Sequence, residues 1–128
     1  MIVVDSSALV AIALAEPDAR DIMKALHDAD RVVISAANLT ETMIVAFGRE
    51  CEPEMRALFD RFGIVVEPVT EARAEAAANV YRRYGKGWHA AGLNFGDSFA
   101  YALAREKACP LLYVGDDFAK TDIASALG

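Results

Sequence analysis

The sequence predicts a three-layer α/β/α fold with a central parallel sheet of four or five strands. Short apolar runs alternate along the chain with longer segments of helical spacing. The first run, Met1–Val4, is apolar at every position, as in a strand that is buried on both faces. With 128 residues, 55% of them hydrophobic, the chain can bury a core. We expect one domain, residues 1–128.

Helices are expected directly after the first strand. Asp5–Ser7 supplies N-cap candidates, so a helix should run from there to about Glu16, and Pro17 separates it from a second helix at about 18–29. The apolar run 8–15 is too short to span a bilayer. It also lacks a preceding Lys or Arg, which a signal peptide would have. We expect a buried helix and no membrane association.

The middle of the chain repeats the alternation. The three β-branched residues within 31–35 predict the second strand there, and apolar residues at helical spacing predict a helix at about 37–49. Pro53 is at a position permitted early in a helix, so a fourth helix is expected at about 53–62. Residues 64–69 are predicted as the third strand.

The last third contains two more helices and a strand. Thr70 can cap an alanine-rich helix that runs to Tyr84. Residues 85–96 form a loop with four glycines, and the helix after it is expected at about 97–107. The fourth strand is predicted at 111–114.

Charge and cysteine content limit the functions to consider. The net charge is −6 and the sequence pI is about 4.8, and on charge alone this disfavours nucleic acid as a partner. Cys51 and Cys109 lie far apart and form no ligand motif, so we interpret both as reduced thiols of a cytoplasmic protein.

Single acidic residues follow the predicted strands or begin the predicted helices. Asp5 ends the first strand, Asp116 and Asp117 follow the fourth, and Asp97 starts the sixth helix. The carboxyl ends of parallel strands form the usual ligand crevice, and a helix N-terminus favours an anion. Each acid also has an ordinary interpretation, because Asp5 and Asp97 suit helix caps and the Asp116–Asp117 pair suits a turn.

A purely structural role, such as a helix cap or a turn, explains Glu41 less well than the other acids. It lies in the middle of the third predicted helix with Ile44 and Val45 at i+3 and i+4, and Asn38 is the only polar side chain nearby on that face. A carboxylate in apolar surroundings is costly unless it is paired or binds a metal ion.

If these acids converge, their charges repel and their pKa values rise unless a cation joins them. Oxygen-only ligands suit Mg²⁺, or Mn²⁺ as a substitute, and not zinc. A carboxylate-held divalent ion can activate water and stabilise a phosphodiester transition state. The pattern therefore indicates metal-dependent phosphoryl chemistry, and bound ions would reverse the local charge that disfavours nucleic acid.

With these residues in view, the whole chain resembles the PIN-domain family, and most closely the VapC-type toxins of bacterial toxin–antitoxin pairs. The block around Asp97 is the most specific part of the resemblance, and the opening Asp is less specific. The motifs that carry it are 1–9, Glu41, 84–87 with His89, 93–104 and 110–118 with Thr121 and Asp122.

The resemblance implies a Mg²⁺-dependent endoribonuclease whose products carry a 5′-phosphate. Asp5 and Asp97 match the family's principal metal ligands, and Glu41 matches the third acidic position. Asp117 is the more regular match to the fourth, with Asp116 the alternative, and Asp122 is a further acid within possible reach of the site. Ser7, which is outside the acidic set, matches a hydroxyl residue beside the first Asp that orients a carboxylate or water.

The resemblance also implies partners. VapC-type toxins are homodimers that a cognate VapB-type antitoxin neutralises, covering the toxin with its C-terminal segment. Apolar side chains on the first helices are candidates for that contact, with ordinary core packing as the alternative: Leu9, Ile12, Ile22 and Met43.

The segment 81–89 mixes cations with aromatic side chains, the combination that single-stranded RNA binding uses. We take Arg82, Arg83, Lys86 and His89 as candidate RNA contacts. The alternative is a solvated helix end whose arginines complement the helix dipole.

Two rival interpretations stay open. A phosphotransfer-type domain also places an Asp after a strand, but a dehalogenase-like phosphatase needs a second Asp where Ser7 stands. A receiver domain needs an acidic pair after the first strand, and Asp5 is alone there. The other rival is a non-catalytic interaction module, in which the acids would serve only as helix caps.

Overall fold

The computed structural model describes residues 1–128 and contains a four-stranded parallel sheet with the strand order β3-β2-β1-β4. The strands are β1 (Ile2–Val4), β2 (Val32–Ser35), β3 (Val65–Glu67) and β4 (Leu111–Leu112). β1 and β2 are therefore central. Of the four or five strands predicted, the sheet has four.

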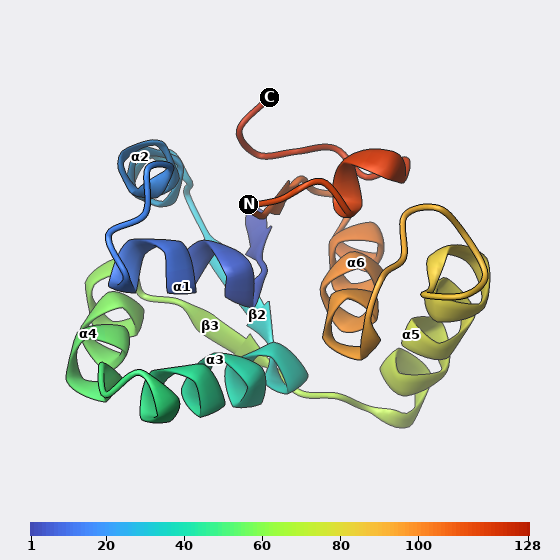
Figure 1. Cartoon of the computed structure of the whole chain (residues 1–128), viewed down its shortest axis with the longest axis horizontal. Helices are drawn as coiled ribbons and strands as arrows, with labels where there is room; N and C mark the ends of the chain where they lie inside the picture. Colours follow the sequence, from blue (N-terminus) through green and yellow to red (C-terminus); the bar gives the residue numbers. More distant parts are fainter.

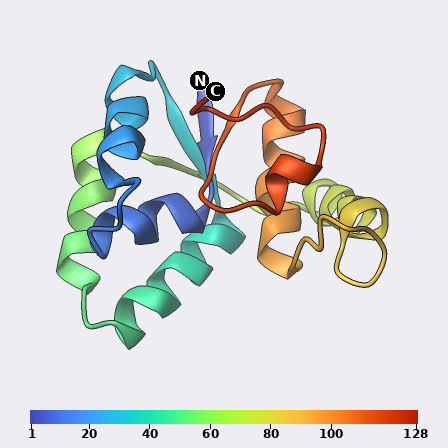
Figure 2. The ribbon, with the colours of Figure 1, turned by 45° about the horizontal axis from the view of Figure 1, so that its top comes forward.

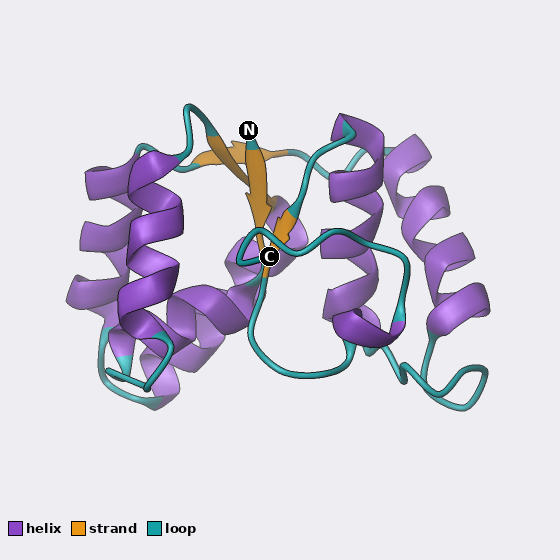
Figure 3. Cartoon of the chain, turned by 90° about the horizontal axis from the view of Figure 1, so that it is seen from above, coloured by secondary structure: helices purple, strands orange, loops and turns teal.

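Six helices cover the two faces of the sheet. They are α1 (Ser6–Ala13), α2 (Ala19–Asp28), α3 (Ala36–Gly48), α4 (Glu52–Phe62), α5 (Glu71–Tyr84) and α6 (Phe95–Lys107), and a short 3₁₀ helix, η1 (Phe118–Lys120), follows β4. α1 to α4 lie on one side of the strands and α5 and α6 on the other (Figures 1 and 3). The predicted three-layer α/β/α fold is confirmed.

Alternation along the strands divides the core between these two layers. Ile2 and Val4 pack into a cluster with side chains of α1 to α4, whereas Val3, between them, packs into a second cluster with α5 and α6. All three side chains are buried. The prediction that the first strand is buried on both faces is therefore confirmed, and it explains why every position is apolar.

Several element boundaries differ from the prediction, and β4 ends at Leu112 rather than at 114. α1 ends at Ala13 rather than near Glu16, because the chain reverses at Ala15, whose φ is 53°. β3 is shorter than 64–69 and lies at the sheet edge, where Val65 is 40% exposed and Val66 is 39% exposed. α6 begins at Phe95, two residues before Asp97. No helix of the chain has the length and apolar character that crossing a membrane requires.

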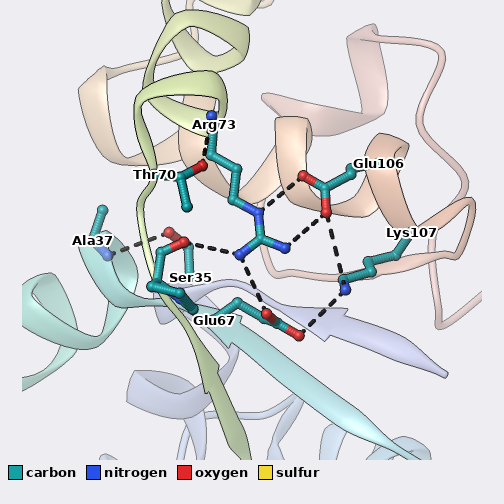
Figure 4. A network of polar contacts seen from close by, with 8 residues as sticks. Ser35, Ala37, Glu67, Thr70, Arg73, Glu106 and Lys107 are labelled. Carbon is teal, nitrogen blue, oxygen red and sulfur yellow. Dashed lines mark hydrogen bonds and ion pairs between the residues drawn. The ribbon is translucent and has the colours of Figure 1, made fainter.

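A network of ion pairs fixes α5 and α6 to the sheet edge (Figure 4). Arg73 of α5 binds Glu106 of α6 through two nitrogens, at 3.0 and 2.8 Å, and its Nη1 lies 3.2 Å from Glu67 Oε2 at the end of β3. Lys107 Nζ is 3.3 Å from the other Glu67 oxygen. The Arg73 hydrogen bond lowers the pKa of Glu106. This network sets the position of α6, which carries Asp97.

Candidate active site

The predicted acids lie on four different elements. Asp5 follows β1 and is the N-cap of α1, Glu41 is on α3, Asp97 is in the first turn of α6, and Asp117 precedes η1. Their charges act on one another: those of Asp97 and Glu41 raise the pKa of Asp5, and those of Glu41 and Asp117 raise the pKa of Asp97. The fold thus brings the four carboxylates into one electrostatic neighbourhood.

Asp5 is almost fully buried, at 2% exposure. Its Oδ2 accepts a hydrogen bond from the Ser7 backbone N–H at 3.0 Å, which is the ordinary helix-cap contact. Its Oδ1 is buried and has no hydrogen-bond partner in the chain. Burial raises the pKa of Asp5 to about 7, against the lowering effect of Ser7. Capping therefore accounts for one oxygen of Asp5 and leaves the other unexplained.

Polar side chains contact Glu41, although most of its neighbours in the sequence are apolar. Ser6 Oγ donates to Glu41 Oε1 at 2.5 Å, and Asn38 Nδ2 lies 3.3 Å from the same oxygen. Asn38 Nδ2 also donates to the Gly96 carbonyl at 2.9 Å, so it joins α3 to the start of α6. A Cβ at Gly96 would clash with the Glu41 carboxylate, so any side chain at this position would have to displace Glu41.

Asp97 is not the N-cap that the sequence indicated. Asn94 is the N-cap, and the two residues form a capping box: the Asp97 N–H donates to Asn94 Oδ1 at 2.8 Å, and the Asn94 N–H donates to Asp97 Oδ2 at 3.0 Å. Burial raises the pKa of Asp97 to about 6, and the neighbouring acids add to the rise. The carboxylate is therefore destabilised despite its hydrogen bond.

The acids near the C-terminus divide into two groups. Asp116 and Asp117 are both exposed, and Asp117 is the one whose charge acts on Asp97. Asp122 is bound elsewhere: it accepts a hydrogen bond from the Tyr101 hydroxyl, which lowers its pKa, and its Oδ2 lies 3.7 Å from Arg105 Nη2. Asp122 is thus tied to Tyr101 and Arg105 of α6.

The two serines after Asp5 have different roles. The Ser7 hydroxyl accepts a hydrogen bond from the Val114 N–H at 3.1 Å, which fixes the end of β4 beside the start of α1. Val114 precedes the Gly115–Asp117 turn, so Ser7 helps to position Asp117. The Ser7 side chain and backbone amide also lower the pKa of Asp5. The hydroxyl that holds the Glu41 carboxylate belongs to Ser6.

The site suits a hard divalent cation, although no three His, Cys, Asp or Glu side chains are arranged as a finished metal site. The donors are carboxylate oxygens, which Mg²⁺ and Mn²⁺ prefer. Asp5 Oδ1 is a buried oxygen without a partner, and the bond from the Asn94 N–H occupies Oδ2 of Asp97 and not Oδ1. The raised pKa values of Asp5 and Asp97 are those of acids that a cation would stabilise.

The candidate RNA contacts lie at the end of α5 and in the loop that leads to α6, on the side of the molecule away from α2 to α4 (Figure 2). Arg82 and Arg83 are exposed; Arg82 binds Asn79, and the Arg83 guanidinium lies over the Tyr84 ring. Lys86 is exposed. His89 Nδ1 accepts a hydrogen bond from the Ala91 N–H at 2.9 Å, so that nitrogen shapes the loop.

Three of the four side chains proposed for antitoxin contact are wrong for that purpose. Leu9 and Ile22 have no exposed surface, and Met43 is 8% exposed, because all three pack in the core under α1 to α4. Ile12 is half-buried and is the one that reaches the surface. Periodicity along a helix identifies its apolar face but does not say whether a neighbouring helix covers it.

A profile of the PIN domain matches residues 2–124, nearly the whole chain. The chain belongs to the PIN-domain family. The resemblance found in the sequence is therefore confirmed.

Curated relatives place the chain in the VapC branch of the PIN family. The chain is 45% identical over 126 residues to a protein named ribonuclease VapC from Mycolicibacterium smegmatis, covering 96% of this chain and 98% of the relative. It is 44% identical over 127 residues to ribonuclease VapC30 of Mycobacterium tuberculosis, covering 96% of each.

Solved structures agree on the PIN fold. Mycobacterium tuberculosis VapC20, described as a sarcin-ricin loop cleaving toxin, matches with a TM-score of 0.78 at 20% identity over 97% of each chain. A chain of a toxin–antitoxin complex from Klebsiella pneumoniae matches with a TM-score of 0.72 at 18% identity, covering 95% of this chain and 93% of that one.

Sequence reasoning missed three residues that organise this candidate site: Ser6, Asn94 and Gly96. Ser6 adjoins Asp5, but its partner Glu41 is 35 residues away, and no local pattern joins them. Asn94 had a readable signal, since an Asn three residues before an Asp has the spacing of a capping box. Gly96 carried none, because its neighbour is a side chain of another helix.

Proposed function

We propose that the chain is a Mg²⁺-dependent endoribonuclease and the toxic component of a VapBC-type toxin–antitoxin pair. One observation carries the proposal: Asp5 keeps a buried, unpartnered oxygen while Glu41 and Asp97 add their charges to it. Relatives at 43–45% identity are named ribonucleases, and one structural neighbour is described as a toxin that cleaves an RNA loop.

In this proposal Asp5, Glu41, Asp97 and Asp117 hold one or two Mg²⁺ ions, for which Mn²⁺ can substitute, and Asp116 is the alternative fourth acid. When bound, Mg²⁺ supplies the polarised water and the charge neutralisation that hydrolysis of a phosphodiester requires. The chain's own groups orient the carboxylates, because each ligand needs a fixed direction. Two of these groups are the Ser6 hydroxyl, which fixes Glu41, and the Asn94 N–H, which fixes Asp97.

Arg82, Arg83, Lys86 and His89 are the proposed RNA contacts. They lie where α5 leads through a short loop into α6, the helix of Asp97. Cationic side chains there would offset the repulsion between phosphates and a chain of net charge −6. Charge in this segment should therefore affect RNA affinity more than it affects the chemical step.

The rival interpretations leave specific features without a purpose. In an interaction module the acids would be only helix caps. Capping satisfies Asp5 Oδ2, so Asp5 Oδ1 would stay buried there without a hydrogen-bond partner. A phosphatase of the dehalogenase type needs an acid where Ser7 stands, and the Ser7 hydroxyl accepts instead from the Val114 N–H. The nuclease proposal uses both features.

The test is cleavage of single-stranded RNA by purified protein, with and without Mg²⁺. We expect cleavage that leaves 5′-phosphate ends, that EDTA abolishes and Mn²⁺ restores, and that Asp97→Asn reduces by several orders of magnitude. Asp60→Asn is the matched control, because Asp60 is an exposed acid of α4. Full activity of Asp97→Asn at the same Mg²⁺ concentration would rule out the assigned role.

We propose that the chain binds a VapB-type antitoxin and a second copy of itself. We also propose that it acts in the cytoplasm, where the free thiols of Cys51 and Cys109 stay reduced. Induced expression should arrest growth, and co-expression of an adjacent antitoxin gene should restore it. Sedimentation of the purified protein should give a dimer mass. Growth unaffected by expression would contradict the toxin role.

A further inference from the structure

We propose that the hollow between α5 and α6 binds a nucleobase of the RNA substrate, beside the phosphate that is cleaved. The proposal rests on the nuclease function proposed above and adds a substrate subsite to it. The hollow has a volume of about 460 Å³, large enough for a base, and three aromatic side chains line it: Tyr81 of α5, and Phe95 and Phe99 of α6.

Small residues on one helix and rings on the other create the space. Ala74, Ala77 and Ala78 share one face of α5, where larger side chains would fill the groove. Opposite them, Phe95 and Phe99 meet edge to face with ring centroids 5.0 Å apart. Phe95 is 75% exposed. Its ring face is thus available to a stacking partner.

The hollow adjoins the acidic site. Asn94 and Phe95 line both this hollow and a second one of about 430 Å³ beside α3, whose wall includes Glu41. Asn94 also forms the capping box with Asp97, one helical turn away, or about 5 Å along the axis. An RNA strand with a phosphate at the acids would therefore carry a neighbouring base to Phe95 and Phe99.

The polar groups at the rim fit a nucleotide. Lys86 lines the hollow and is exposed, so its ammonium can reach a phosphate. Asn94 uses Oδ1 to accept from the Asp97 N–H, which leaves Nδ2 to donate to a base edge. Rings for stacking beside cations for phosphate are the chemistry of single-stranded RNA binding. A second copy of the chain could pack against the apolar walls of the hollow, but such packing would give no role to the Lys86 ammonium at its rim.

The experiment measures binding of a short single-stranded RNA in the presence of Mg²⁺. The RNA carries a non-hydrolysable linkage at the cleavage point, so that cleavage is prevented while the metal ligands stay intact. Phe95→Ala and Phe99→Ala are compared with Phe47→Ala, an exposed phenylalanine of α3 that lines neither hollow. We expect each of the first two to raise Kd by about 5- to 150-fold, the range that loss of one stacked base gives, and Phe47→Ala to leave Kd unchanged.

An abasic scan of the RNA identifies the base. One abasic nucleotide next to the cleavage point should weaken binding to the parent protein and have little further effect on Phe95→Ala, because both changes remove the same contact. Phe95 is exposed, so this variant should fold normally. Equal losses in parent and variant would overturn the proposal. So would unchanged RNA affinity together with a change of oligomeric state, which would make the hollow a contact between copies.

This outcome is separable from that of the nuclease proposal. If the wild-type protein fails to cleave RNA in Mg²⁺ while Phe95→Ala still removes base-dependent binding, the nuclease proposal fails and the base site stands. If the wild-type protein cleaves RNA and Phe95→Ala binds and cleaves normally, the base site fails and the nuclease stands.

Discussion

Replacing Asp5 by Asn should stabilise the metal-free protein at neutral and alkaline pH. Burial raises the pKa of Asp5 from 3.8 to about 7, so the folded protein holds a proton there that the unfolded chain releases above about pH 4. Three pKa units correspond to at most about 4 kcal/mol. Asn removes the charge and keeps the N-cap hydrogen bond to the Ser7 N–H.

The sign follows from proton binding in the two states. Between about pH 4 and pH 7 the folded state binds more protons than the unfolded state, so wild-type stability falls as pH rises and levels off above pH 7. The advantage of Asp5→Asn should therefore be small at pH 4, and should grow to about 2–4 kcal/mol at pH 8.

Urea denaturation at pH 4, 6 and 8 in EDTA measures the difference in free energy of unfolding between Asp5→Asn and the wild type. Asp60→Asn is the control and should not differ from the wild type. Addition of Mg²⁺ should then raise the melting temperature of the wild type and not that of Asp5→Asn, because a ligand that binds only the folded state stabilises it. An Asp5→Asn protein that is less stable than wild type at pH 8, or whose advantage does not change with pH, would refute the assigned cost of the buried charge.

Three further substitutions test the contact of Gly96 with Glu41, the ion pairs of Arg73, and the candidate RNA contacts. Gly96→Ala should lower RNA cleavage about 10- to 100-fold in a steady-state assay, because its Cβ would displace Glu41, while circular dichroism shows an intact fold; normal cleavage would contradict the contact. Arg73→Met should lower the free energy of unfolding in urea by about 1–2 kcal/mol, since it breaks the ties from α5 to β3 and α6; an unchanged value would contradict that. Replacing both Arg82 and Arg83 by Glu should weaken RNA binding and reduce the salt dependence of Kd, while kcat is preserved. An unchanged salt dependence would show that these residues do not contact RNA phosphates.

Local signals in the sequence predict most of this fold. The apolar run before Asp5 indicates a buried central strand, and the strand–helix alternation indicates a parallel sheet with helices on both faces. Sequence gave no indication that β3 is the edge strand, because strand order depends on packing between distant segments. Residues 1–128 as one domain stays a prediction.

The acids of the candidate site could be predicted, and most of the contacts that orient them could not. Asp5, Asp97 and Asp117 adjoin element ends that the sequence marks, and Glu41 is conspicuous among apolar neighbours. The bond that orients Glu41 spans 35 residues, and the Asn38 contact with the Gly96 carbonyl spans 58. Such contacts follow from the docking of α1, α3 and α6, which a single sequence does not specify.

The shared cation site among the four acids is tested most directly by the position of Mn²⁺ in a crystal of the protein, located by its anomalous scattering. We predict a Mn²⁺ peak within coordination distance of Asp5 Oδ1 and of at least one oxygen each from Asp97 and Glu41 or Asp117. A peak elsewhere on the surface, or none at a Mn²⁺ concentration that supports RNA cleavage, would contradict it.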